Sequence, residues 1–359
     1  MELQHRVLRS PSAACHPVRS GSLNGAPRVV AIGGGTGLPS VLRGLRPLLA
    51  DRGQSADDLD GLTAIVTVTD DGGHSGWVRR ELGTLPPGDV RNCLAALSDG
   101  SPLARLLQHR FDDSREFAGH SVGNLMLAGL AQITGDFAEA VNQMEQLLTT
   151  HGRVLPSTQE SICLRAQFES GDVIDGETAI AGRHGRIRRL SLERPVRPLP
   201  DALRALINAD GIVVGPGSLY TSVLPNLLVG GIAPTISSVN GVRIYVANLM
   251  TEPGETDHFS LDDHLRVIYD HVGAHLFDYV LVNRRQLTPC RAADQAQGGA
   301  HPIAVSVPLE FAGQAEVVGG DFLTELPDGE VRHAPGDLAA AILRLIARGR
   351  PDQRGAKLL

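Results

Sequence analysis

Apolar residues in this chain occur in short runs that stop at glycine-rich or polar loops. Such runs, bounded by turn residues, predict buried β-strands. Between them lie longer segments in which apolar residues recur with the spacing of an amphipathic helix. The predicted strands cover residues 29–32, 62–68, 211–214, 243–247 and 279–283. The predicted helices cover residues 40–50, 89–97, 125–133, 137–148, 200–209, 223–229 and 336–348.

The alternation of strand and helix predicts an α/β fold with a mostly parallel sheet, because a crossover helix returns the chain to a parallel strand. The segment at about 154–194 has a different pattern. Short apolar runs, including Thr178-Ala179-Ile180, alternate there with Gly-Asp and His-Gly turns. We predict an antiparallel hairpin excursion in this segment. Residues 286–300 are polar and are predicted to be a linker.

The two ends of the chain differ from the middle. Residues 1–27 are rich in Ser, Pro, Gly, Arg and His and show no helix or strand period, so we predict a disordered N-terminal leader. Residues 28–350 are predicted to form a single α/β domain, and residues 351–359 a flexible tail. No repeat of 20 to 50 residues is visible, which excludes a solenoid.

The composition, with 42% hydrophobic and 20% charged residues, is typical of a globular protein with a large core. The formal net charge of −7 gives no general reason to bind nucleic acid or an anionic membrane, so a small molecule is the expected partner. No apolar run approaches the roughly 18 residues of a membrane span. The four cysteines form no C-x-x-C pair, which fits the cytoplasm. A homodimer is left open.

The first predicted strand ends in a glycine-rich loop, Gly33-Gly34-Gly35-Thr36-Gly37, directly before a predicted helix. Amide N–H groups at a helix start, together with the helix dipole, commonly bind phosphate. The alternative is a tight turn without a ligand. Neither the dinucleotide motif G-x-G-x-x-G nor the lysine-containing ATPase motif fits, because the single lysine of the chain is Lys357. Positive charge at this phosphate site is therefore expected from arginine or from backbone amides.

A second loop repeats this pattern. Gly215-Pro216-Gly217-Ser218 follows the predicted strand at 211–214, and Thr221 precedes the next helical run. Because the carboxyl ends of parallel strands meet at one edge of a sheet, we expect the two loops to form walls of one composite site.

Two adjacent carboxylates, Asp70 and Asp71, follow the predicted strand at 62–68 and precede Gly72 and Gly73. They are candidate catalytic residues, as a general base or as ligands of Mg²⁺, and they are also candidates for binding ribose hydroxyls. The alternative is a solvated Asp-Gly turn. None of the motifs requires a cofactor.

Four further residues have a predicted local role. Asp89 follows Pro-Pro-Gly and is predicted to be the N-cap of a helix. Arg91 in the first turn of that helix is unfavourable for the helix dipole, which indicates an anionic partner. Arg332 and His333 are predicted to form a small cationic pair before the last helix.

Several stretches taken together, AIGGGTGLPSVLRGL, TVTDDGGHSG, LPPGDVRNCLAAL, GHSVGNL, GPGSLYTSVLPNLL and NLMTEPGETD, resemble the bacterial gluconeogenesis factor family. That family is related to 2-phospho-L-lactate transferase within the CofD-like superfamily. The resemblance spans about residues 28–348 and implies a Rossmann-like three-layer α/β/α fold. It further implies a cytoplasmic protein needed for cell morphogenesis and for growth on gluconeogenic carbon. The ligand that it implies is a UDP-sugar, such as UDP-N-acetylglucosamine, or another nucleotide.

The resemblance also applies to individual positions. It implies that the two glycine loops, the loop at 70–75 and Asn124 line the ligand site, and that Arg332 is directed toward the ligand. His74 stands where the family usually has serine, and Trp77 where arginine is common, so the contacts of this loop are expected to differ in detail. The predicted ligand-binding residues are Gly33, Gly34, Gly35, Thr36, Gly37, Asp70, Asp71, Gly72, Gly73, Ser75, Arg91, Asn124, Gly215, Pro216, Gly217, Ser218, Thr221 and Arg332.

Three functions fit these features to different degrees. A regulatory protein that binds a nucleotide-sugar is favoured because no set of nucleophile, base and orienting residue is evident. A transferase that passes a phosphorylated hydroxy-acid unit from an activated nucleotide would use Asp70 or Asp71 to bind Mg²⁺ or to act as a base. Ser40 stands where such transferases commonly have Lys or Arg, which favours the binding protein. The missing dinucleotide motif disfavours an NAD-dependent oxidoreductase.

Overall fold

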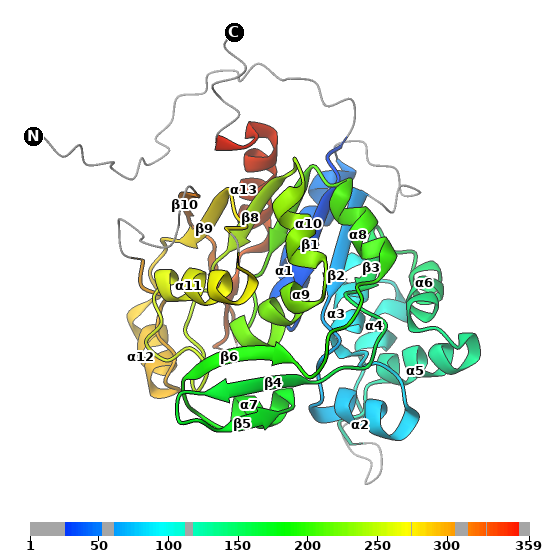
Figure 1. Ribbon diagram of the computed structural model, residues 1–359. Coiled ribbons are helices and arrows are strands. Elements are labelled where there is room, and N and C mark those ends of the chain that lie inside the picture. The colour runs from blue at the N-terminus through cyan, green and yellow to red at the C-terminus, as the bar shows by residue number, and fades with distance from the viewer. Residues whose placement is uncertain are drawn as a thin grey trace, which may run out of the picture.

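A central sheet of seven parallel strands organises the computed structural model, which describes residues 26–51, 61–111, 118–273, 275–305, 315–327 and 329–351 (Figure 1). The strand order is β10-β9-β8-β7-β1-β2-β3. The strands are β1 (Val29–Gly33), β2 (Leu62–Val66), β3 (Arg153–Pro156), β7 (Gly211–Val214), β8 (Val242–Val246), β9 (Tyr279–Asn283) and β10 (Glu316–Gly320). The predicted α/β class and mostly parallel sheet are confirmed.

Strand β1 lies in the middle of this sheet, between β2 and β7, and pairs with both in parallel register. Every residue of β1 is buried, because helices cover both faces of the sheet. Val29 and Ala31 point into one core cluster, whereas Val30 and Ile32 point into the other. This two-sided burial explains why the strands have continuous apolar runs instead of an alternating pattern.

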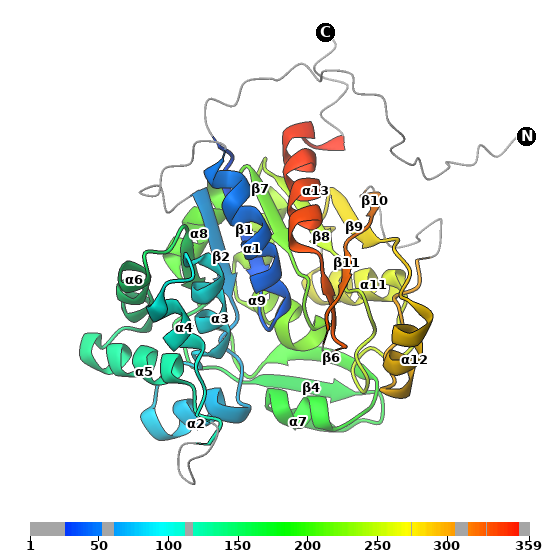
Figure 2. The same ribbon diagram turned by 180° about the vertical axis from the view of Figure 1, so that it is seen from behind.

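Helices on the two faces form the outer layers of the three-layer fold. One face is covered by α1 (Gly37–Ala50), α3 (Gly88–Leu97) and α13 (Pro335–Arg348), with α4 (Pro102–Gln108), α5 (Val122–Thr134) and α6 (Phe137–Leu148) beside α3 (Figure 2). The other face is covered by α8 (Pro200–Ile207), α9 (Leu224–Leu228), α10 (Ile232–Ser238) and α11 (Leu261–Val272), with a π-helical turn at Leu219–Val223.

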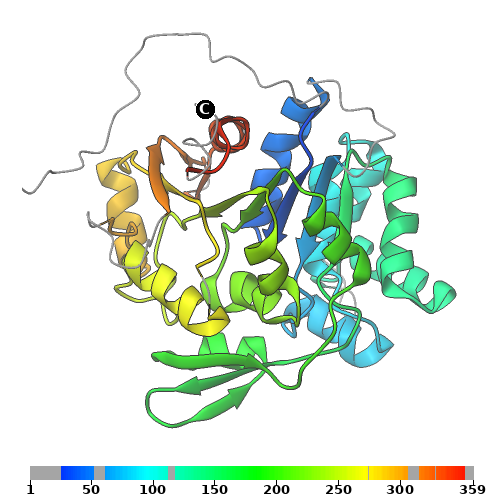
Figure 3. The same cartoon turned by 45° about the horizontal axis from the view of Figure 1, so that its top comes forward.

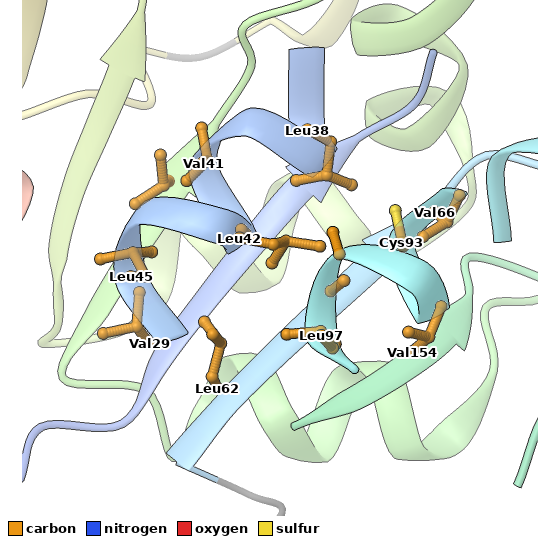
Figure 4. Packing of buried hydrophobic residues seen from close by; sticks show 14 of the residues in the cluster. Val29, Leu38, Val41, Leu42, Leu45, Leu62, Val66, Cys93, Leu97 and Val154 are labelled. Atoms are coloured by element: carbon orange, nitrogen blue, oxygen red, sulfur yellow. The ribbon is translucent and has the colours of Figure 1, made fainter. Parts of the chain in front are cut away.

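The core between α1, α3 and the sheet is formed by interdigitating aliphatic side chains (Figure 4). Leu38, Leu42 and Leu45 on α1 follow the helical spacing and are completely buried against β1 and β2. Full burial of a leucine side chain stabilises a fold by about 1.5–3 kcal/mol. This packing determines where α1 begins, and therefore where the glycine loop lies.

The predicted antiparallel excursion is a separate three-stranded sheet of β4 (Leu164–Phe168), β5 (Val173–Asp175) and β6 (Ile187–Leu192), in the order β5-β4-β6. Its predicted start at about 154 is wrong, because residues 154–156 belong to β3, which pairs with β2 in parallel. It lies across the carboxyl end of the central sheet (Figures 1 and 3). The interpretation of Thr178-Ala179-Ile180 as a strand is wrong, because these residues belong to helix α7 (Glu177–Gly182). A three-residue apolar run is too short to distinguish helix from strand.

Besides α7, five described helices were not predicted: α4, α10 and α11, and the two that follow. Helix α12 (Pro289–Gln297) occupies most of the segment predicted to be a linker, and none of its residues is buried. A helix without a buried face has no apolar stripe, so its sequence resembles a loop. Helix α2 (Gly73–Leu82) begins inside the predicted Asp-Gly loop. A small hairpin of β11 (Leu323–Glu325) and β12 (Val331–His333) precedes α13.

The predicted leader and tail lie outside the described residues, apart from 26, 27 and 351, and the predicted domain limits stay predictions. In the described part of the chain, no single helix has the length and apolar character needed to cross a membrane. The segments Leu219–Leu228 and Ile232–Ser238 meet those criteria only as a pair bent by 77°.

Glu145 on α6 is expected to make the stability of this fold depend on pH. Its buried carboxylate accepts a hydrogen bond from the backbone N–H of Val154 on β3, and burial raises its pKa from 4.5 to about 7. The native protein therefore binds this proton more tightly than the unfolded chain does. The free energy of unfolding is expected to fall as the pH rises from about 4.5 to about 7, by up to about 3 kcal/mol.

The variant Glu145→Gln keeps the hydrogen-bond acceptor and removes the charge. Urea unfolding of this variant at pH 5 and pH 8 is expected to show a smaller difference than in the wild type. Glu139→Gln, at an exposed position of the same helix, is the control and should retain the wild-type difference. An unchanged pH dependence in Glu145→Gln would contradict this assignment.

Candidate functional site

The loops after β1 and β7 lie side by side at the carboxyl edge of the sheet. From β1 the chain proceeds outward to β2 and β3, and it later returns to β7 on the other side of β1 and proceeds to β8, β9 and β10. Open α/β sheets bind their ligands at such a switch point, because the two connections diverge and leave a crevice. A cleft of about 200 Å³ lies at this place.

Four segments form the cleft: the start of α1, the loop after β7, the loop after β8 and strand β12. Of the predicted site residues, it brings together Gly35, Thr36, Gly37, Pro216, Gly217, Ser218 and Arg332. The cleft-lining residues that were not predicted are Ser40, Ser222, Asn248, Leu249, Met250, Thr251, Glu252, Val331 and His333.

The two glycine loops form one unit. The amide of Gly215 donates to the carbonyl of Ile32 at 2.9 Å, and the Asn226 side chain on α9 donates to the carbonyl of Gly33 at 3.0 Å. Gly37 packs so tightly against Pro216 that a Cβ at position 37 would lie 2.3 Å from the Pro216 carbonyl oxygen. The similar patterns of the two loops therefore correspond to a direct contact in space.

The start of α1 provides unpaired backbone donors to this cleft. Thr36 is the N-cap residue, but its side chain makes no capping hydrogen bond, and the first turn contains no acidic residue. The hydroxyl of Ser40 donates to the Thr36 carbonyl at 3.3 Å. The first N–H groups of a helix have no partner within the helix, and the dipole of a 14-residue helix favours an anion there.

The prediction that Asp89 is a helix N-cap is wrong. Helix α3 begins at Gly88, so Asp89 lies inside its first turn. The Asp89 carboxylate accepts a hydrogen bond from the backbone amide of Gly35 at 2.7 Å. Desolvation of this partly buried carboxyl, reinforced by the charge of Asp70, raises the pKa of Asp89 to about 6. One amide of the glycine loop is therefore already bound to an anionic group of the protein.

The candidate catalytic carboxylates Asp70 and Asp71 are both engaged within the protein. Asp70 accepts from the amide of Gly72 at 2.8 Å, which is an Asp-type turn. Asp71 accepts from both the amide and the hydroxyl of Thr178, at 2.8 and 2.7 Å, and so caps helix α7. Among the described residues, no three His, Cys, Asp or Glu side chains are grouped as a metal site would require.

Glu177, which the sequence did not single out, completes a group of carboxylates behind the glycine loop. It accepts a hydrogen bond from the Thr69 hydroxyl at 3.3 Å. Burial, together with the neighbouring Asp70, Asp89 and Asp71, raises the pKa of Glu177 to about 9, so this carboxyl is protonated at neutral pH. No local signal marks Glu177, because helix α7 reaches this edge only through the folding of the antiparallel excursion.

Arg91 on α3 and Asn124 in the first turn of α5 do not line the cleft. They lie near each other, because Arg91 contacts Ser121 directly before α5. The Arg91 guanidinium is buried and donates to the hydroxyl of Ser121 and to the side chain of Asn92. His74 accepts from the amide of Ser121 at 2.8 Å. Burial, with the nearby His120 and the arginines, lowers the pKa of His74 to about 4, so its imidazole is neutral at physiological pH.

The remaining predicted residues are structural neighbours of the cleft and do not line it. They are Gly33, Gly34, Asp70, Asp71, Gly72, Gly73, Ser75, Gly215 and Thr221. The structure therefore separates the predicted set into residues that line this cleft and residues that do not.

Strand β12 places Arg332 on the wall of the cleft, where its guanidinium is partly exposed and paired with Glu330. Arg332 and His333 were predicted to form a cationic pair, and this prediction is wrong for His333, which is neutral at physiological pH. Burial lowers the pKa of His333 to about 4, and its ring nitrogen Nε2 lies 3.3 Å from the Ala247 carbonyl. Arg332 is therefore the charged member of this pair.

A second cavity, of about 350 Å³, adjoins the cleft through Asn248, Leu249 and Met250, which line both. Its other walls include the segment after β9 with Arg284 and Arg285. Together the two cavities provide a polar part at the helix start and a larger, more apolar part beside it. This arrangement suits an elongated ligand with an anionic group and an organic moiety.

Comparisons with known proteins agree with the resemblance seen in the motifs. The family model described as 2-phospho-L-lactate transferase CofD matches residues 29–323. A gluconeogenesis factor of Halalkalibacterium halodurans is 43% identical over 318 residues, which cover 88% of this chain and 95% of that protein. A gluconeogenesis factor of Bacillus subtilis is 40% identical over 322 residues, which cover 89% and 98% of the two chains.

Solved structures show the same fold. A crystal structure of a member of the upf0052 family from Bacillus halodurans is 42% identical to this chain, with a TM-score of 0.81, and the match covers 88% of this chain and 99% of that one. A second crystal structure of a protein from the same organism is 43% identical, with a TM-score of 0.83 and the same coverage.

Proposed function

This chain belongs to the CofD family, alongside proteins named gluconeogenesis factors, and we propose that it is a gluconeogenesis factor that binds a nucleotide-sugar such as UDP-N-acetylglucosamine. The proposal includes the cytoplasmic location and the role in cell morphogenesis and growth on gluconeogenic carbon that the sequence resemblance implies. A homodimer stays a prediction.

The uncapped start of α1 is the observation that carries the proposal. Its first residues line the cleft together with Ser40 and Ser222, and Arg332 also lines it. Backbone N–H groups at a helix start and an arginine are the usual ligands of a diphosphate. We place the diphosphate there, and the nucleoside or the sugar in the adjoining cavity of about 350 Å³.

The alternative, a transferase acting on a nucleotide-activated substrate, has less support. The Asp71 carboxylate already accepts two hydrogen bonds from Thr178, which leaves it poorly placed to take a proton from a substrate. Metal-dependent turnover that is lost in Asp71→Asn would favour the transferase over the binding protein.

Replacing Arg332 with alanine is expected to weaken the binding of UDP-N-acetylglucosamine about 10- to 100-fold, the usual effect of losing a charge-assisted hydrogen bond. Titration calorimetry at pH 7.5 measures this. Arg348→Ala is the matched control, because Arg348 is a partly exposed arginine paired with Glu316 and is absent from the cleft lining.

Two results would contradict the proposal. One is the absence of binding at millimolar UDP-N-acetylglucosamine, with tight binding of a guanosine or deazaflavin compound in its place. The other is equal affinity in the wild type and in Arg332→Ala, which would mean that the anionic group of the ligand binds elsewhere.

A further inference from the structure

The glycine loop has two sides, and a carboxylate of the protein occupies one of them. Gly35 and Gly37 line the cleft, but the amide of Gly35 donates to Asp89, which is not among the cleft-lining residues. A Cβ on Gly34 would lie 2.5 Å from the Asp89 carboxylate oxygen Oδ2. Gly34 is therefore required by the close approach of this carboxylate, and not by a ligand.

We propose that Asp89 is a positioning residue that directs the anionic group of the ligand to the Gly37 side of the loop, and that binding is coupled to the uptake of a proton by Asp89. This inference rests on the proposed function, because it concerns the same cleft.

The geometry excludes the Gly35 amide from direct phosphate binding. A second anion at this amide would have to displace a partly buried carboxylate that is held by the hydrogen bond of 2.7 Å. The amides of Gly37 and Ser218 remain on the cleft side, whereas the Gly217 amide donates to the Asn248 side chain at 3.1 Å. An anionic group bound there is separated from Asp89 only by the backbone of the loop.

An anion in the cleft and an ionised Asp89 repel each other across a buried region, where the effective dielectric constant is low. The Arg91 guanidinium, two residues away, is directed to Ser121 and Asn92, and its charge lowers the pKa of Asp89 less than the charge of Asp70 raises it, so it does not cancel this repulsion. Protonation of Asp89 removes the repulsion, and the resulting acid can still accept from Gly35 through its carbonyl oxygen. Ligand binding therefore favours the protonated form.

The charges around Asp89 come from several elements. Asp70, in the loop after β2, raises the pKa of Asp89, whereas Arg91 and the Gly35 amide lower it. Glu177 on α7 and Cys93 on α3 are neutral at pH 7, because burial raises the pKa of each. With a pKa of about 6 in the free protein, Asp89 is mostly ionised at pH 7.5 and can take up a proton when the ligand binds.

Titration calorimetry in buffers with different ionisation enthalpies measures protons taken up on binding. UDP-N-acetylglucosamine is a suitable probe, because both of its phosphates are esterified and do not titrate near neutral pH. The wild type at pH 7.5 is expected to take up a substantial fraction of one proton. Its affinity is expected to increase several-fold between pH 8 and pH 6.

Asp89→Asn keeps an acceptor for the Gly35 amide and removes the charge. This variant is expected to bind about 3- to 10-fold more tightly than the wild type at pH 7.5, without proton uptake and with an affinity that does not change between pH 6 and pH 8. Glu145→Gln is the control, because the pKa of Glu145 is also raised by burial but Glu145 is not among the cleft-lining residues, so this variant should retain the wild-type proton uptake. Glu252→Gln tests the carboxyl that lines the cleft and whose pKa is also raised by burial.

The possible failures are distinguishable. Absence of binding by the wild type contradicts the proposed function and this inference together. Binding by the wild type without proton uptake contradicts only the inference, and this measurement does not depend on whether a variant folds. Loss of proton uptake in Glu252→Gln would assign the coupling to Glu252 and would overturn the role of Asp89.

Discussion

Replacing Gly35 with valine is expected to reduce the affinity for UDP-N-acetylglucosamine by more than about 100-fold while the protein stays folded. Gly35 has φ of +60°, a conformation that a β-branched residue rarely adopts and that costs about 1–3 kcal/mol. Its new side chain would also lie against the Ser222 hydroxyl, since a Cβ would be 3.4 Å from that oxygen. The loop is therefore expected to move away from both Asp89 and the cleft.

The matched control is Gly83→Val. Gly83 has φ of +67° at the end of α2, and a Cβ there would have no heavy atom within 4 Å. This variant has the same backbone strain but lies outside the cleft lining, so its stability should fall by a similar amount and its affinity should be unchanged. Calorimetry and thermal unfolding of both variants test the prediction. An unchanged affinity in Gly35→Val would place the ligand away from the glycine loop.

Replacing Asp278 with alanine is expected to cost about 3–5 kcal/mol of the free energy of unfolding, the usual effect of leaving a buried charge without its partner. Asp278 precedes β9 and accepts from Arg243 on β8 through the backbone amide, Nε and NH2, at 2.9, 3.0 and 2.6 Å. Both side chains are less than 10% exposed. The pair lies at the amino-terminal ends of the strands, so ligand affinity should not change under native conditions.

Asp175→Ala provides the contrast. Asp175 forms a comparable two-point pair with Arg165, at 2.6 and 2.8 Å, but both side chains are more than 40% exposed. Removing it should leave the free energy of unfolding nearly unchanged, because water replaces the lost partner. Guanidinium unfolding of both variants measures the difference. Equal small losses would mean that Arg243 has sufficient alternative hydrogen-bond partners when Asp278 is absent.

The sequence was sufficient for most of the secondary structure around the sheet. Strands β7 and β9 and helix α6 have the predicted limits, because each combines a clear apolar pattern with turn residues at its ends. Helix α11 was missed although five of its residues are buried, whereas two other missed or misassigned helices have few buried residues. Helix α12 has none, and helix α7 has only Ile180, so their apolar patterns are too weak to reveal a helix.

The candidate site was only partly predictable. The two glycine loops could be identified because glycine is required where the backbone approaches another group closely, as at Gly37 and Pro216. The roles of carboxylates were not predictable, because they depend on partners that are distant in the sequence. Asp89 is paired with Gly35 over 54 positions, and Asp71 with Thr178 over 107.

The sequence alone therefore determined the α/β class, the parallel strands, the antiparallel excursion and the two loops, since apolar periodicity and glycine position are local properties. Only the tertiary structure decided which side of the glycine loop is open. It placed the Asp89 carboxylate on the Gly35 amide and turned Asp71 toward α7, and it placed Arg332 on the wall of the cleft. These outcomes depend on burial and on the meeting of distant segments, and neither is a property of the local sequence.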